Sequence, residues 1–183
     1  MSFFKKYPTI TYNNHLMRNI ILKSQIVQEV FERFEVFYPY IIEDGERPDT
    51  ISYDYYGDSD YWWVILMANK IVDPYYEWPL THSELKGYII KKYGSIPEAK
   101  SDIKHYVYTG IGGEDENEIA RKSWIMPVET FTNLGAEEKS GWTPIYSYDY
   151  EETVNDEKRS IQILDRNYIS QINNDLKSIF NDR

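Results

Sequence analysis

The chain has 183 residues, a formal net charge of −10 and no cysteine, and its size fits one ordinary domain or one small domain with extensions. The missing cysteines exclude disulfides, thiolate catalysis and Cys-type zinc sites, and the acidic balance argues against nucleic-acid binding, which needs clustered Lys and Arg. No stretch approaches the ~20 apolar residues of a membrane span, and no signal-peptide pattern opens the chain, so we expect synthesis in a cytoplasm.

Residues 1–35 are predicted to form an N-terminal arm followed by a helix. Residues 1–18 show neither a helical nor a strand period, so they are either a free tail or an arm that lies on a partner. In the second case the aromatic anchors of the arm would be Phe3, Phe4, Tyr7 and Tyr12. Residues 19–23 are a candidate strand, and the apolar spacing over residues 26–34 predicts a helix.

Residues 36–81 are predicted to form a compact unit with the order strand, helix, helix, strand. Residues 38–42 are an aromatic and β-branched run that is typical of a strand. Pro48 suits the first turn of the first helix, where its missing N–H costs nothing. Gly57 can end that helix because glycine readily adopts the left-handed conformation.

The second helix of this unit is predicted to begin after a capping residue, either Asp58 or Ser59. The residue before Pro74 is pushed out of the α region, which interrupts the chain again. Residues 75–80 are then predicted to return as a short strand beside residues 38–42.

Residues 82–183 are predicted to be a C-terminal α+β extension that ends in an amphipathic helix. Its first element is a helix over residues 85–93, which Thr81 or Ser83 would open and Gly94 would close.

Four strands and a terminal helix are predicted further along this extension. Residues 105–109 and 124–128 are expected to pair as a hairpin, and the alternating tyrosines of residues 146–152 suggest another strand or an extended edge. Residues 161–163 alternate as in a half-buried strand. An apolar stripe over residues 168–180 predicts the helix, which packs either on its own chain or in a groove on a partner.

No residue pattern in the chain predicts an enzyme, a metal site or a cofactor site. The three histidines are far apart in the sequence, and the acidic residues do not follow the spacing of a calcium loop. The glycines of residues 110–113 lack the Lys-Ser/Thr of a phosphate loop, and no serine lies in a nucleophile elbow. We therefore expect no catalytic, cofactor-binding or metal-binding residues.

Aromatic residues are frequent in this chain, at 16%, and 18 of them are tyrosines. Tyrosine joins a large apolar ring to a hydroxyl that needs a hydrogen-bond partner, so it suits surfaces that become buried on assembly. The alternative is that many of these rings are simply half-exposed on a small domain.

The strings RPDTISYDYYGD and NKIVDPYYEWPL, with a Tyr-Trp-Trp helix between them, carry a family resemblance. The Asp-Thr-Ile-Ser opening, the Tyr-Gly helix stop and Asn69 after the second helix resemble the LysM pattern. More specifically, the chain is similar to the LysM-like baseplate wedge protein of contractile-tailed bacteriophages over residues 38–80 and, less closely, over residues 155–182. The resemblance implies an α+β fold with a LysM-like βααβ unit, and a place in the virion tail.

The same resemblance implies a structural protein that clamps neighbouring baseplate wedges together through protein–protein contacts during tail assembly. The implied partners are the other wedge proteins and the inner baseplate ring near the tail hub, with about six copies or a multiple in each baseplate. We expect neither nucleic acid nor a membrane among the partners. The predicted partner-binding residues are Phe3, Phe4, Trp62, Trp63, Tyr75, Tyr76, Trp78, Tyr168, Ile172, Leu176 and Phe180.

The LysM pattern also suggests an alternative, a binding module for N-acetylglucosamine-containing glycans such as peptidoglycan or chitin. The sugar would lie between the loops of residues 44–49 and 70–78, where Tyr75, Tyr76 and Trp78 could stack on its rings. The bulky aromatic residues of the second loop favour docking to a protein instead.

Overall fold

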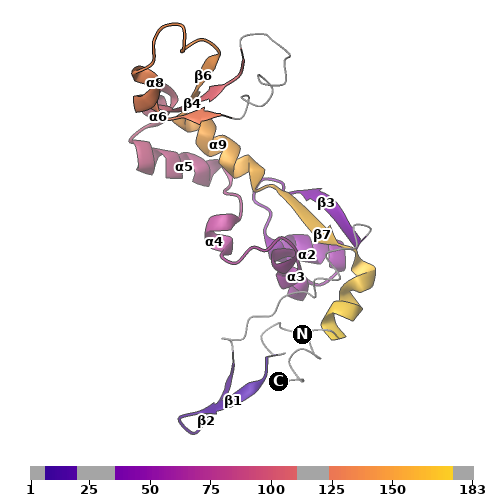
Figure 1. Cartoon of the computed structure of the whole chain (residues 1–183). Coiled ribbons are helices and arrows are strands. Elements are labelled where there is room, and N and C mark those ends of the chain that lie inside the picture. The colour runs from indigo at the N-terminus through magenta and orange to yellow at the C-terminus, as the bar shows by residue number, and fades with distance from the viewer. Residues whose placement is uncertain (1–6, 20–35, 111–123, 175–183) are drawn as a thin grey trace. The chain divides into compact units, whose positions relative to one another are not determined.

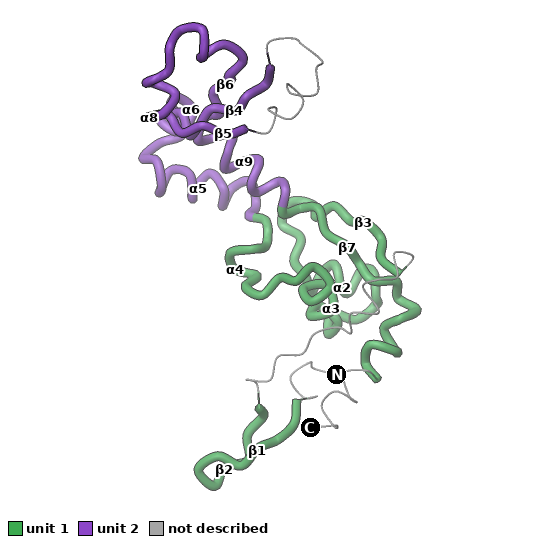
Figure 2. Tube along the Cα trace, viewed as in Figure 1, with its two compact units in different colours: residues 1–79, 158–183 green, residues 80–157 purple. Residues whose placement is uncertain are grey.

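The computed structural model describes residues 7–19, 36–110 and 124–174. The chain divides into two compact units, and the second, residues 80–157, is inserted in sequence within the first, residues 1–79 and 158–183 (Figure 2). The protein mixes helices and strands, which confirms the predicted α+β class. The predicted partition into residues 1–35, 36–81 and 82–183 differs from this grouping, because residues 158–183 belong to the unit that contains residues 36–79. Among the described residues, no helix has the length and apolar character needed to cross a lipid bilayer.

The first unit is built on a two-stranded antiparallel sheet with helices packed on one face. Its elements after the N-terminal segment are β3 (Phe37–Ile41), α2 (Pro48–Tyr56), η3 (Ser59–Tyr61), α3 (Trp62–Ala68), α4 (Pro74–Glu77), β7 (Ser160–Leu164) and η4 (Arg166–Tyr168). Residues 169–174 are helical. β3 and β7 lie side by side in Figure 1, with Tyr38 opposite Ile163 and Tyr40 opposite Ile161.

The predicted strand at residues 75–80 is wrong. Pro74 occupies the first turn of α4, and the Asp73 side chain caps this helix by accepting the N–H of Tyr75 at 3.0 Å. Proline and an N-cap aspartate together favour a helix start over a strand. The strand that pairs with β3 is β7, which confirms the predicted strand at residues 161–163 but gives it a partner that no local pattern indicated.

Local signals in α2 act as predicted. Pro48 lies in its first turn, and Gly57 ends it with φ of 78°, donating its N–H to the carbonyl of Tyr53. Asp58 then caps η3 by accepting the N–H of Asp60 at 2.9 Å.

Two apolar clusters form the core of the first unit. One contains Ile42, Ile51, Ile65, Ile161 and Ile163, so α2, α3, β7 and the residue that follows β3 all contribute to it. The other is centred on Trp63 and contains Tyr7, Val36, Val64, Leu164, Ile169 and Ile172. Burying a side chain of this size contributes roughly 1.5–3 kcal/mol, so these clusters hold β7 to residues far from it in sequence.

Asn69 fastens β7 to α3 by polar contacts. Its amide nitrogen donates to the carbonyls of Ile65 and Gln162, and its amide oxygen accepts the N–H of Gln162, each at 2.8 Å. The hydroxyl of Tyr56 donates to the carbonyl of Leu164 at 3.0 Å. The asparagine of the LysM-like pattern therefore has a structural task in this chain.

Residues 9–18 form a β-hairpin, β1 (Thr9–Tyr12) and β2 (His15–Arg18), where the sequence predicted no strand period. Asn13 and Asn14 turn the chain with φ of 48° and 60°, the left-handed conformation that asparagine tolerates in two-residue hairpin turns. Tyr7 is buried in the Trp63 cluster, so it does not serve as an exposed anchor. The predicted elements of residues 20–35 lie outside the described residues.

The second unit joins a three-stranded sheet to four helices among its described residues. Its elements are α5 (His82–Tyr93), α6 (Ile96–Ser101), β4 (Ile103–Tyr108), β5 (Ile125–Met126), α8 (Val128–Thr132), β6 (Trp142–Tyr146) and α9 (Ser147–Glu157). The strand order is β5-β4-β6, and the pairing of β4 with β5 confirms the predicted hairpin. Thr81 and Glu84 form the capping box of α5 and Gly94 ends it, as predicted.

The predicted strand at residues 146–152 is wrong, because residues 147–157 are the helix α9. Its buried residues are all polar, Ser147, Glu151 and Asn155, and they recur every four residues on one helical face. The Asn155 amide donates to the Leu80 carbonyl at 3.0 Å and accepts the Leu80 N–H at 2.7 Å. A helix whose inner face is polar shows no apolar stripe in its sequence.

Candidate protein-interaction surface

Polar side chains hold the backbone of residues 72–78, which we call the α4 segment, in place. The Asp73 carboxylate accepts the Tyr75 N–H at 3.0 Å, and one oxygen of Glu77 accepts the N–H groups of Val72 and Asp73 at 2.6 and 3.1 Å. From outside the segment, the Lys158 ammonium donates to the Tyr76 carbonyl at 2.8 Å. These contacts satisfy the backbone groups that a four-residue helix leaves unpaired at its ends.

The side chains of the same segment are strongly exposed. Val72 and Tyr75 are each 80% exposed and Tyr76 is 70% exposed, so these three form what we call the α4 surface. The two tyrosine rings meet edge to face, with centroids 4.9 Å apart and planes at 83°. Adjacent exposed apolar side chains mark interaction sites, and a fixed backbone lowers the entropy lost on binding.

Trp78, at the end of the same segment, is used partly inside the chain. Its ring packs against the isoleucine cluster of the first unit, and its indole N–H donates to the Glu46 carbonyl at 2.9 Å. The Glu46 carboxylate in turn accepts the Tyr40 hydroxyl and the Glu43 N–H, both at 2.7 Å. Burial, followed by the hydrogen bond to Glu46, raises the pKa of Tyr40 above its usual value.

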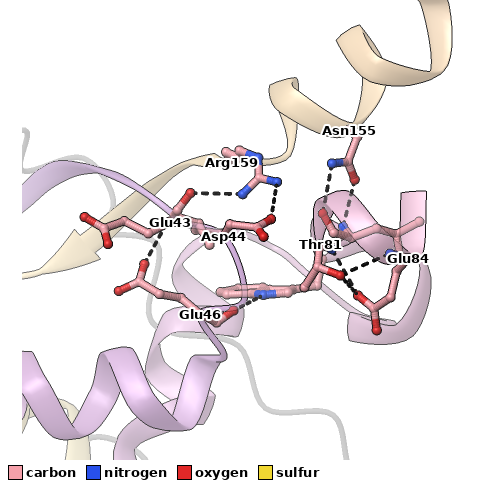
Figure 3. Close-up of polar contacts among 10 residues, drawn as sticks. Glu43, Asp44, Glu46, Thr81, Glu84, Asn155 and Arg159 are labelled. Carbon is pink, nitrogen blue, oxygen red and sulfur yellow. Dashed lines mark hydrogen bonds and ion pairs between the residues drawn. The ribbon is translucent and has the colours of Figure 1, made fainter. Parts of the chain in front are cut away.

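The loop around Glu46 is also held by Arg159, which directly precedes β7 (Figure 3). The Arg159 guanidinium donates to the Asp44 carboxylate at 3.2 Å and to the Ile42 carbonyl at 3.3 Å. The Arg159 side chain is only 13% exposed, so this ion pair is better shielded from water than an ordinary surface pair. The hydrogen bonds of Trp78 and Arg159 therefore fix the loop of residues 42–46 to the α4 segment and to the start of β7.

The remaining predicted partner-binding residues divide into two groups. Trp63 and Ile172 are each 2% exposed, and Trp62 and Tyr168 pack partly buried against the same cluster, so these four support the core of their own chain. Of the adjacent tryptophans, Trp63 is the one that faces inward. The others lie outside the described residues, namely Phe3, Phe4, Leu176 and Phe180.

Sequence reasoning missed Val72 as part of the exposed surface. The sequence pattern gave no signal for its exposure, and in the structure the N–H groups of Val72 and Asp73 donate to the Glu77 carboxylate. Tyr75 and Tyr76 are the described members of the predicted partner-binding set that stay strongly exposed, and Tyr12, predicted as an anchor of the arm, is 62% exposed.

The most polar cluster of the second unit is a structural ion pair. Glu151 is buried and accepts the Lys92 ammonium and the Tyr93 hydroxyl, both at 2.7 Å. Burial alone would raise the pKa of Glu151, but the hydrogen bonds from Lys92 and Tyr93 outweigh it and the pKa is lowered. A carboxylate held in its charged form is poorly suited to act as a general acid at neutral pH.

Known proteins match the chain at two levels. Residues 2–179 match the model of the family described as base plate wedge protein 53. Over 57 residues the chain is 33% identical to the baseplate wedge protein gp53 of Enterobacteria phage T4. This alignment covers 31% of the chain and 29% of that relative, so it spans less than a third of either protein.

Proposed function

Because this chain belongs to the base plate wedge protein 53 family and is therefore a structural component of a phage tail baseplate, we propose that it clamps neighbouring wedges together. The clamp acts through protein–protein contacts made during tail assembly. Its partners in the proposal are the other wedge proteins and the inner baseplate ring near the tail hub, with about six copies or a multiple in each baseplate.

The observation that supports this proposal is the α4 surface. Val72, Tyr75 and Tyr76 are 70–80% exposed on a backbone fixed by Asp73, Glu77 and Lys158. Tyrosines are frequent among the residues that dominate protein–protein binding energies. A clamp also gains from several weak contacts on one chain, since each raises the effective concentration of the next.

We propose that the protein has no enzymatic activity. Among the described residues of the second unit, the buried carboxylate is that of Glu151, which pairs with Lys92 and has a lowered pKa. The hydrogen bonds of Glu151 to Lys92 and Tyr93 hold α9 against α5, so a structural role accounts for this buried carboxylate.

Glycan binding is the weaker candidate. Stacking on a sugar needs a free aromatic face between the loops of residues 44–49 and 70–78. Trp78 instead lies against the isoleucine cluster and bonds the Glu46 carbonyl, so it ties these two loops to each other.

The test replaces Tyr75 and Tyr76 by Ala in the full chain and measures binding to a wedge assembled from the other baseplate proteins of the same phage. Each tyrosine that acts as an interface hot spot should weaken binding by roughly 30-fold. Because both side chains are exposed, the urea midpoint of the free protein should not change.

Tyr53→Ala is the matched control, since Tyr53 is 64% exposed on α2, outside the α4 surface. Unchanged wedge binding by the double variant would refute the role of the α4 surface. Saturable binding of the wild-type protein to chitin oligomers or insoluble peptidoglycan, with no binding to the wedge, would instead establish the glycan function.

A further inference from the structure

The β1–β2 hairpin stands apart from the other strands in how its edges are protected. A strand edge presents unpaired N–H and C=O groups, and proteins usually blunt such edges with proline, a side-chain cover or short length. Each remaining strand edge in the described residues carries one of these devices.

β3 and β7 are protected by different means. In the β3–β7 ladder the Ile42 N–H donates to the Arg159 carbonyl. The backbone groups of successive residues point alternately towards the partner strand and away from it, so those of Pro39 lie on the free edge of β3, where proline offers no N–H. On the free edge of β7, both backbone groups of Gln162 bond the Asn69 side chain.

The second unit protects its edges similarly. The Thr109 N–H bonds the Gly141 carbonyl, so alternation directs Pro144 to the free edge of β6. β5 has only two residues, and Pro127 follows it directly. A second copy of this chain therefore offers no open edge in its β3, β5, β6 or β7.

The strands of the hairpin are longer than β5, with four residues each, and neither of them contains a proline. The Asn19 N–H bonds the Pro8 carbonyl, so alternation directs the backbone groups of Thr9, Thr11, Leu16 and Arg18 away from the ladder. No other strand of the described residues pairs with β1 or β2, and all eight strand residues are exposed.

One face of the hairpin is also largely apolar. Ile10 and Met17 lie opposite each other, with Tyr12 next along the same face, and they are 40%, 50% and 62% exposed. His15, which lies opposite Tyr12, completes this face. A two-stranded hairpin with no covered face is at best marginally stable in water. At its base the hairpin is held by the Arg18 guanidinium, which donates to the Tyr7 carbonyl at 2.7 Å.

The positive charge of the sequence that contains the hairpin favours some partners over others. The first 28 residues contain four Lys or Arg and no Asp or Glu, within a chain of net charge −10. Two such segments repel each other, which disfavours pairing between the hairpins of two copies. An acidic partner is favoured by the same charges.

We propose that residues 9–18 add as two strands to the open edge of a β-sheet in a different baseplate protein, and that this edge is flanked by Asp and Glu side chains. Main-chain hydrogen bonds from Thr9 and Thr11, or from Leu16 and Arg18, extend the partner's sheet. The apolar face of Ile10, Tyr12 and Met17 then packs on the partner's surface. This proposal rests on the proposed baseplate function and adds a second contact, separate from the α4 surface.

The test compares Thr11→Pro and Leu16→Pro in the full chain, bound to a wedge assembled from the other baseplate proteins of the same phage. Each proline removes one outward N–H and no donor of the hairpin itself. The proline on the edge that binds should weaken binding roughly tenfold or more, because a buried acceptor in the partner loses its donor. Thr11→Val and Leu16→Ile keep the N–H, and their binding should stay within about twofold of wild type.

A second measurement needs no variant. Amide hydrogen exchange should slow on complex formation at Thr9 and Thr11, or at Leu16 and Arg18, and the affinity should fall as salt rises from about 50 to about 300 mM. Unchanged exchange at all four amides would overturn the proposal, and so would binding by both proline variants as tight as wild type. Salt-independent affinity would overturn the acidic partner. If the wild-type protein fails to bind the wedge at all, the proposed function falls as well. If the wild-type protein binds and only the variant of Tyr75 and Tyr76 loses binding, the proposed function stands.

Discussion

Replacing Asn69 tests whether one polar side chain holds the closing strand of the first unit. Its amide makes three hydrogen bonds of 2.8 Å, one to Ile65 and two to Gln162. A net contribution of about 1 kcal/mol for each bond would give about 3 kcal/mol, and water can replace part of this because Gln162 is exposed. We therefore expect Asn69→Ala to lower the free energy of unfolding by about 2 kcal/mol.

Asn69→Asp separates the donor from the acceptor. The aspartate keeps the bond from the Gln162 N–H, but at neutral pH it places a negative charge against the carbonyl oxygens of Ile65 and Gln162. The charged form is disfavoured in the folded protein, so the pKa of this aspartate is raised there. Its stability deficit should accordingly shrink as the pH falls from 7 towards about 4, where protonation restores one donor.

Urea unfolding followed by tryptophan fluorescence measures both variants, and hydrogen exchange of residues 160–164 locates the effect. Asn167→Ala is the control, because Asn167 lies in the same unit with an exposed side chain. Equal stability of wild type and Asn69→Ala, or unchanged exchange in β7, would refute the role given to Asn69.

Two further predictions concern the helices. Glu151→Ala should lower the free energy of unfolding of the second unit by about 2 kcal/mol, because it removes the hydrogen bonds from Lys92 and Tyr93. Since the pKa of Glu151 is lowered in the folded protein, its stabilising contribution should be full above pH 4.5, its ordinary pKa, and should vanish as acid protonates the folded carboxylate. A pH series of thermal melts of the wild-type protein that showed no such loss would contradict this prediction. Gly57→Ala should destabilise the first unit by about 1 kcal/mol, because a φ of 78° strains any residue with a Cβ. Gly87→Ala inside α5 should stabilise the second unit by up to about 1 kcal/mol, because alanine favours a helix more than glycine does. Urea midpoints of the two variants that move in the same direction would be inconsistent with this reasoning.

Elements with local signals were predictable from the sequence. Pro48 and Gly57 mark both ends of α2, and Thr81 with Gly94 marks those of α5. The hairpin at Asn13-Asn14 also had a local signal, two residues that tolerate positive φ between strand-compatible runs, but polar and apolar residues alternate only in residues 9–12 and not in residues 15–18.

Long-range pairing and polar faces were beyond local patterns. β3 pairs with β7 across the whole inserted unit, and nothing in residues 75–80 reveals that the partner strand lies elsewhere. The inward residues of α9 are Ser147, Glu151 and Asn155, whose hydrogen bonds depend on Asp102, on residues of α5 and on Leu80. For the candidate site, Tyr75 and Tyr76 were predicted from their residue type, whereas the burial of Trp63 and the double use of Trp78 required the fold.

The placement of one unit within the other has a consequence for synthesis. On the ribosome, β3 and α3 emerge early, yet β7 becomes available only after residues 80–157 have been made. The isoleucine cluster that β7 completes stays unfinished for that interval, with apolar side chains open to water. Because β3 and β7 are far apart in the sequence, we expect their pairing to be slow and the nascent chain to need protection from misassociation until β7 has left the exit tunnel.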